Sequence, residues 1–174
     1  MFNEINILRL FFEEPSREFN VREAARILHI APATASSRLK KFAERGLLKK
    51  RKERQLLLYK ANLESNFYRD MKSFYNLRKI RDSGLLEDFD RFYLRPTVVL
   101  FGSAAQGMDT ENSDFDFLII SENTKIFPYK DKYEKILRKP LQIFAAKSIK
   151  AIKNKHLISN MLNGIVLQGG IIWN

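Results

Sequence analysis

Residues 101–120 read FGSAAQGMDTENSDFDFLII, and this stretch decides the fold of the C-terminal half of the chain. It follows Thr97–Phe101, an uninterrupted apolar and β-branched run that is typical of a strand buried on both faces. Gly102 lets the backbone bend at the end of that strand. AAQG can then form one helical turn, so that Ser103 and the neighbouring N–H groups lie at a helix N-terminus, where phosphate oxygens bind readily.

Two carboxylates follow the loop MDTENS, at the start of a second strand, DFDFLII. Strand alternation puts Asp114 and Asp116 on one face, about 6.6 Å apart along the strand, with Phe115 and Phe117 on the other. Two like charges held this close repel each other unless a cation neutralises them. Hard carboxylate oxygens suit Mg²⁺ or Mn²⁺, which also bridge nucleotide phosphates. The pattern therefore predicts a site for a divalent metal and a triphosphate.

Other phosphate and metal motifs do not fit the same stretch. Gly102 and Gly107 have the spacing of a P-loop, but Met108-Asp109 stand where Lys and Ser or Thr are required. Read as a calcium loop, DTENSD lacks the glycine at its sixth position and the Glu at its twelfth. The coupling of Gly-Ser to Asp-x-Asp, with ten residues between them, is the specific signal.

The stretch resembles the signature of the DNA polymerase β superfamily of nucleotidyltransferases. Its compact form resembles that of the minimal nucleotidyltransferases within this superfamily. The resemblance covers residues 95–174, with PLQIFAA as the next strand and NGIVLQGGIIW as the terminal strand region. It implies that Gly102 and Ser103 bind the nucleotide phosphates. It also implies that Asp114 and Asp116 are catalytic and bind the metal ions, Mg²⁺ or Mn²⁺, with an NTP, first of all ATP, as substrate.

One position departs from that family. Active members carry a third carboxylate on the strand after the Asp-x-Asp strand, and Gln142 occupies the matching position here. Gln is neutral and cannot deprotonate a nucleophile, and losing a general base costs about 10²- to 10⁴-fold in rate. Asp131 and Glu134 on the preceding predicted helix are poor substitutes. Nucleotide and metal binding can survive this change without transfer.

The N-terminal third is basic. The chain has a net charge of +11, and residues 36–60 hold 10 Lys and Arg against 2 Asp and Glu. Such a block indicates a surface that meets phosphates, although a solvated helix face is the simpler alternative.

Three helices and a hairpin are predicted in this third. A stripe of Ile5, Leu8 and Phe12 predicts the first helix; Asn20 caps the second, and Pro32 begins a third, which ends near Gly46. LLKKRKERQLLLYKA then reads as two short strands, although their turn near residues 53–54 lacks Gly or Asn.

Residues 1–62 resemble the winged helix-turn-helix domains of prokaryotic regulators, with the third helix as recognition helix. Small hydroxyl side chains and cations on one helix suit the DNA major groove and its phosphates. The candidate DNA-binding residues lie on this helix and on the hairpin: Thr34, Ser36, Ser37, Arg38, Lys40, Lys41, Lys52 and Arg54. The alternative is a three-helix unit that mediates protein contacts.

The chain is thus expected to be an α+β protein of three segments. These are a winged helix-turn-helix (1–62), a helical connector (63–94) with a break at residues 83–84, and a small mixed β-sheet nucleotidyltransferase domain (95–174). The connector carries an apolar stripe of Phe67, Met71 and Phe74. This stripe either packs against a flanking domain or forms the contact between the two copies of a homodimer.

Several classes are excluded or disfavoured by composition. The chain has no cysteine, and His29 and His156 stand alone, so disulfides and zinc sites are not expected. No apolar run reaches eighteen residues, and the N-terminus is acidic, so we expect a cytoplasmic protein that neither spans a membrane nor carries a secretory signal.

The leading functional hypothesis is a DNA-binding nucleotidyltransferase that acts on an unknown hydroxyl acceptor. The resemblance adds one candidate acceptor, a partner toxin, because compact members include antitoxins that nucleotidylate toxins and repress their own genes. The alternative is a transcription regulator whose inactive C-terminal domain is a nucleotide sensor or dimerisation platform. A third possibility is transfer onto RNA ends or small molecules.

Overall fold

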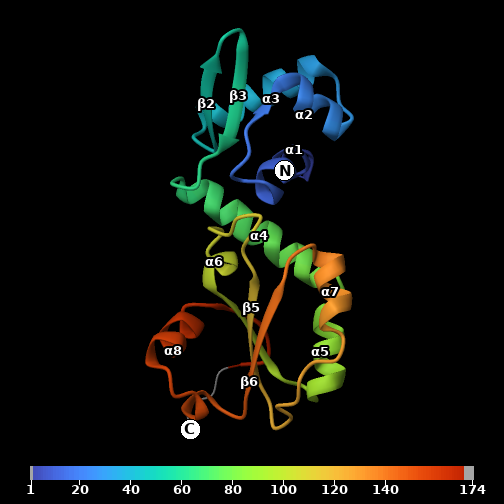
Figure 1. Cartoon of the computed structure of the whole chain (residues 1–174), viewed down its shortest axis with the longest axis vertical. Coiled ribbons are helices and arrows are strands. Elements are labelled where there is room, and N and C mark those ends of the chain that lie inside the picture. Colours follow the sequence, from blue (N-terminus) through green and yellow to red (C-terminus); the bar gives the residue numbers. More distant parts are fainter. Residues whose placement is uncertain (1, 171–174) are drawn as a thin grey trace. The chain divides into compact units, whose positions relative to one another are not determined.

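The structure of the protein is a computed structural model that describes residues 2–170, apart from the side chains of residues 2–5 and 156. It divides into two compact units, residues 1–75 and 76–174, and the boundary falls within helix α4 (Asn66–Asp82) (Figure 1). The predicted packing of Ile5 and the predicted end of the last strand, residues 171–173, lie outside what is described.

The first unit contains three helices and a small antiparallel sheet. The strands pair in the order β1-β3-β2. In chain order the elements are α1 (Phe2–Glu13), β1 (Phe19–Asn20), α2 (Val21–Leu28), α3 (Pro32–Glu44), β2 (Leu48–Glu53) and β3 (Leu56–Ala61). The three predicted helices and the predicted hairpin are all formed.

The ends of α2 and α3 follow from local side-chain chemistry. The Asn20 side chain accepts a hydrogen bond from the Glu23 backbone N–H at 2.9 Å, which confirms the predicted N-cap of α2. The Glu23 carboxylate accepts a hydrogen bond from Arg17, 2.5 Å away. Pro32 is the first residue of α3, where its missing N–H costs no helical hydrogen bond.

The core of this unit is built on the predicted helical stripes. Leu8 and Phe12 of α1 and Leu39 and Phe42 of α3 are buried in one cluster. Tyr68 of α4 completes the cluster, and its hydroxyl donates a hydrogen bond of 2.6 Å to the Phe11 carbonyl. Residues 1–75 therefore bury a core of their own.

The hairpin of β2 and β3 turns over two residues, since Glu53 pairs with Leu56 across the ladder. Arg54 adopts the left-handed conformation, with φ of +53°. Tight hairpin turns need such a positive φ, which is normally supplied by Gly, Asn or Asp. The hairpin therefore forms with a residue that is strained at this position.

The second unit is a four-stranded sheet with helices on both faces. The strand order is β6-β5-β4-β7, in which β5 and β6 are parallel and the other pairs antiparallel. After α4 come α5 (Leu85–Tyr93), β4 (Thr97–Phe101), α6 (Gly102–Ala105), β5 (Phe115–Ile120), α7 (Lys130–Leu137), β6 (Leu141–Ala146), a 3₁₀ turn (Ile149–Ala151), α8 (Lys155–Leu162) and β7 (Ile165–Gln168). The predicted mixed sheet and the α+β class are confirmed.

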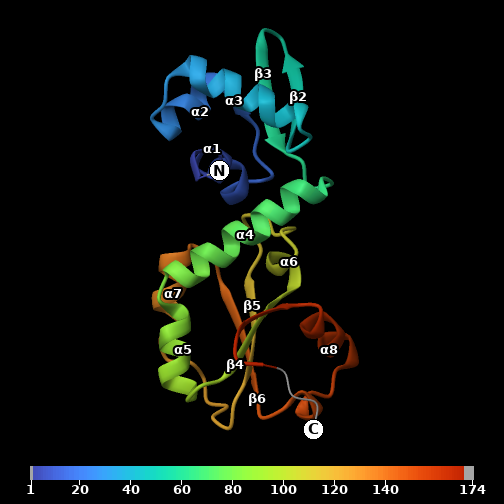
Figure 2. The ribbon, with the colours of Figure 1, turned by 180° about the vertical axis from the view of Figure 1, so that it is seen from behind.

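Helices cover this sheet unequally on its two faces. On one face Phe89 of α5 packs against Phe117 of β5, in a cluster that also contains Tyr133 of α7. On the other face α8 contributes Met161 to a smaller cluster with Leu118. Figures 1 and 2 show α5 and α7 on one side of the sheet and α8 on the other.

The connector forms α4 and α5 with the break at residues 83–84, as predicted. The prediction that the apolar stripe of the connector packs against a flanking domain is wrong for Phe67 and Phe74, which are 50% and 46% exposed. Tyr68, one residue further along α4, takes the core position, because the helix presents that neighbouring face to the cluster. The homodimer stays a prediction.

Within residues 2–170, no helix combines the length and the apolarity needed to cross a bilayer.

The strained hairpin turn yields a prediction. Arg54→Gly removes the side chain whose Cβ disfavours positive φ, and we expect the free energy of unfolding to rise by about 0.5–1 kcal/mol. Urea denaturation of the two proteins measures this difference. Lys52→Gly, in the regular part of β2, is the matched control and should lower stability by about as much; a loss of stability in Arg54→Gly would contradict the strain argument.

Candidate metal and phosphate site

The two predicted acids lie at the start of β5, where three strands meet. Asp114 immediately precedes the strand and Asp116 is its second residue, and both are half-buried. In the sheet register Asp116 is opposite Phe101 on β4 and Gln142 on β6. The end of β4 and the start of β6 therefore flank Asp116 in the sheet.

Gly102 brings the backbone directly against Asp116. It follows β4, begins α6 and has φ of +71°, in the left-handed region. A Cβ at this position would overlap the Asp116 Oδ2 atom. Only glycine provides both the conformation and the close approach, so the sequence signature has a steric cause here.

Ser103 is half-buried in the first turn of α6, next to Gly102. Its carbonyl accepts a hydrogen bond from the Met108 N–H at 2.9 Å, which closes the turn after α6. The structure thus brings Gly102 and Asp116 into contact distance and places Ser103 next to that contact in the chain.

Gln142 is the partner of the other acid. Its Nε2 atom donates a hydrogen bond of 2.6 Å to Asp114 Oδ2. Gln142, which stands where the family carries a third carboxylate, is therefore adjacent to both acids. It is opposite Asp116 in the strand register and hydrogen-bonded to Asp114. A neutral amide here supplies a donor, whereas a carboxylate would supply another negative charge.

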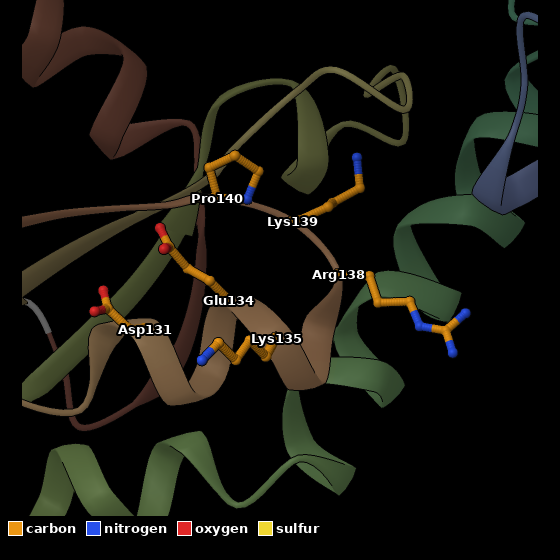
Figure 3. A pocket seen from close by; sticks show the side chains of 6 residues that line it. All are labelled: Asp131, Glu134, Lys135, Arg138, Lys139 and Pro140. Atoms are coloured by element: carbon orange, nitrogen blue, oxygen red, sulfur yellow. The ribbon is translucent and has the colours of Figure 1, made fainter.

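The acids considered as substitutes lie on α7, and Glu134 binds the start of β6. Glu134 Oε1 accepts a hydrogen bond from the Leu141 N–H at 2.8 Å. Glu134 and Asp131 line a hollow of about 440 Å³ beside α7, together with Lys135, Arg138, Lys139 and Pro140 (Figure 3). In the part of the chain that the structure describes, no group of three acids that could hold a metal is formed, so neither Asp131 nor Glu134 joins Asp114 and Asp116 as a third carboxylate.

The electrostatics at Asp116 favour a bound cation. Burial raises the pKa of the Asp116 carboxyl, and the neighbouring charge of Asp114 raises it further. Among the described residues no group of three or more His, Cys, Asp or Glu side chains could hold a metal. Mg²⁺ commonly takes one or two carboxylates and completes its shell with substrate phosphates and water, so this pair of acids fits an ion shared with a nucleotide.

The candidate DNA-binding residues lie on α3 and on the hairpin of β2 and β3. All of them are exposed except Arg38, which is half-buried: Thr34, Ser36, Ser37, Arg38, Lys40, Lys41, Lys52 and Arg54. On the same hairpin Arg51 is paired with Glu18 through two hydrogen bonds of 2.7 and 2.6 Å. DNA binding by this set stays a prediction.

A buried ion pair of Asp109 and Lys139 lies next to the acids and was not predicted from the sequence. Lys139 Nζ is 3.0 Å from Asp109 Oδ2. The two residues are thirty positions apart in the chain, in a loop and after a helix. No periodic pattern connects residues in such places, so only the fold reveals the pair.

Comparison with known proteins supports the assignment of the C-terminal part. Residues 83–166 match the family model of the nucleotidyltransferase domain, and this segment includes the Gly-Ser pair, both acids and Gln142. No curated protein matches the chain.

The raised pKa of Asp116 predicts a pH dependence of stability in the absence of metal. The folded state holds a proton on Asp116 more tightly than the unfolded state, whose pKa is near 3.8. The contribution of Asp116 to stability therefore falls as pH rises from 3.8 through the folded pKa. We compare the free energy of unfolding of the wild type with that of Asp116→Asn. The wild type should lose stability relative to this variant between about pH 3.5 and about pH 7.

Urea denaturation in EDTA at several pH values measures this difference. Asp114→Asn is the matched control, because it removes the neighbouring charge and leaves the burial of Asp116 unchanged. The pH dependence should shrink in that variant without vanishing. A wild type that gains stability over Asp116→Asn as the pH rises would contradict the sign of the shift.

Proposed function

We propose that this protein is a DNA-binding nucleotidyltransferase that transfers a nucleotidyl group from a metal-bound NTP, first of all ATP, to a hydroxyl acceptor. The observation that carries the proposal is the close approach of Gly102 to Asp116, beside Asp114, inside the segment that matches the nucleotidyltransferase family. A phosphate-binding turn and a pair of acids are the minimum that metal-assisted phosphoryl chemistry requires.

Each residue has a defined role in this proposal. Gly102 and Ser103 bind the nucleotide phosphates through the start of α6, and Asp114 and Asp116 hold Mg²⁺ or Mn²⁺. The ion, when bound, offsets the charge of the triphosphate and of the two acids. In the reaction the acceptor oxygen forms a bond to the α-phosphorus, the bond to the β-phosphate oxygen breaks, and pyrophosphate leaves. The acceptor hydroxyl loses its proton to solvent water in this step.

The residue at the family's third carboxylate position does not take up this proton. Gln142, which bonds to Asp114, cannot accept it, because an amide is not basic in water. This observation favours a second candidate, in which the domain binds the nucleotide and metal but does not transfer. The protein is then a transcription regulator whose C-terminal part is a nucleotide sensor or dimerisation platform.

The N-terminal unit supplies the DNA-binding half of the proposal. Exposed cations and hydroxyl side chains on α3 and the hairpin support double-stranded DNA as partner, read by a winged helix-turn-helix in a homodimer. The exposed Phe67 and Phe74 of α4 are the candidate dimer contacts. A partner toxin is the first candidate acceptor, and RNA ends or small molecules are the next.

Pyrophosphate release tests the enzymatic half. The purified protein, incubated with labelled ATP and Mg²⁺, should release pyrophosphate, and Asp114→Asn should lower the rate by at least about 10²-fold. Gln142→Glu restores a third carboxylate and should raise the rate by about 10-fold or more. Binding of ATP with no release in either the wild type or Gln142→Glu would leave the regulator as the better description.

The dependence of DNA affinity on salt tests the other half. An interface with about 6 to 10 phosphate contacts loses about 10³- to 10⁵-fold in affinity between about 50 and about 200 mM salt. We expect a slope of this size, reduced by about one for each of Lys40→Ala and Lys41→Ala. Lys147→Ala, an exposed lysine of the second unit, is the matched control. Binding that does not respond to salt would contradict a phosphate-directed surface.

A further inference from the structure

The ion pair of Asp109 and Lys139 is almost completely removed from solvent. The side chain of Asp109 is 0% exposed and that of Lys139 is 7% exposed. Charges at such depth destabilise a fold unless they are paired and hydrogen-bonded, and a hydrophobic pair is often the more stable alternative. Stability alone therefore does not explain why this unit retains two charged residues here.

Besides its ion pair with Asp109, the Lys139 ammonium group binds the turn of residues 110–113. It donates to the carbonyls of Thr110 and Ser113, the latter at 3.3 Å. The turn is closed by the Ser113 N–H, which donates to the Thr110 carbonyl at 3.1 Å, and by the Thr110 N–H, which donates to Ser113 Oγ at 2.9 Å. Asp114 follows this turn directly, so Lys139 holds the segment that carries the first acid.

Asp109 connects the same turn to the phosphate-binding side of the site. The Asn76 side-chain amide donates to Asp109 Oδ1 at 2.8 Å and to the Ala104 carbonyl of α6 at 3.0 Å. Lys139 is followed by Pro140, which precedes β6, the strand that carries Gln142. The Pro140 carbonyl accepts a hydrogen bond of 2.9 Å from the Phe115 N–H of β5. One ion pair thus joins α6, the turn before Asp114 and the start of β6.

We propose that Asp109 and Lys139 are positioning residues, which hold Asp114 beside Asp116 before a cation binds. The inference rests on the proposed function of the two acids. Two carboxylates without a cation repel each other, and Asp114 lies just outside the ladder of β5, whose first paired residue is Phe115. Lys139 opposes this movement by fixing the turn, which reduces the ordering that metal binding would otherwise require.

Figure 3 shows the direction of the Lys139 side chain. The Lys139 side chain points away from Asp131 and Lys135, although all three line the same hollow. Its terminal nitrogen contacts the loop between α6 and β5.

The experiment compares the wild type with Asp109→Asn, Lys139→Met and the double variant in the full chain. Each single variant leaves one buried charge without its main partner and should lose stability, whereas the double variant should regain much of it. We expect the Mn²⁺ affinity of the double variant, measured by electron paramagnetic resonance, to stay about 10-fold or more below that of the wild type. The backbone amides of residues 110–116 should exchange hydrogen faster.

The double variant Asp88→Asn/Lys132→Met is the matched control, because it removes an ion pair of 3.1 Å between α5 and α7 in the same unit. It should change neither Mn²⁺ affinity nor exchange at residues 110–116. Unchanged exchange in the Asp109→Asn/Lys139→Met protein would overturn the inference and leave the pair a purely structural one. A wild type that binds neither Mn²⁺ nor ATP would instead refute the proposed function, and the exchange rates would still decide whether the pair orders the turn.

Discussion

The candidate site depends on the contact between the Gly102 backbone and the Asp116 carboxylate. The contact requires a strand that ends at residue 101, a left-handed turn directly after it and a second strand in antiparallel register, so that residues 101 and 116 are opposite each other. A side chain at position 102 would be strained by the positive φ and would force the Asp116 carboxylate to move. The rest of the second unit, with α5 and α7 on one face and α8 on the other, keeps these strand ends in register.

Much of the fold follows from local patterns. Periodicity and caps identified the helices of the first unit, since Asn20 and Pro32 act within a few residues of their positions. Alternation placed Phe115 and Phe117 in the core and the two acids on the other face. The hairpin turn was less certain, because Arg54 is a poor residue for positive φ and the pairing of β2 with β3 compensates for it.

The parts that sequence patterns could not supply are those that depend on tertiary pairing. Phe67 and Phe74 share a helical stripe, yet the rotation of α4 about its axis puts Tyr68 into the core in their place. The parallel register of β5 and β6, which sets Gln142 beside the acids, is a contact between segments more than twenty residues apart. The same holds for Asp109 and Lys139, whose pairing exists only after the turn and the helix end have been brought together.

The register of β5 and β6 also determines what a mutation at position 142 would change beside the two acids. A Gln codon becomes a Glu codon by one base substitution, and residue 142 already points its amide at Asp114. A carboxylate there would replace this 2.6 Å hydrogen bond by two like charges in contact, so Asp114 would have to turn away or share a cation with it. A single base substitution therefore separates the neutral amide at position 142 from a third carboxylate beside the two acids.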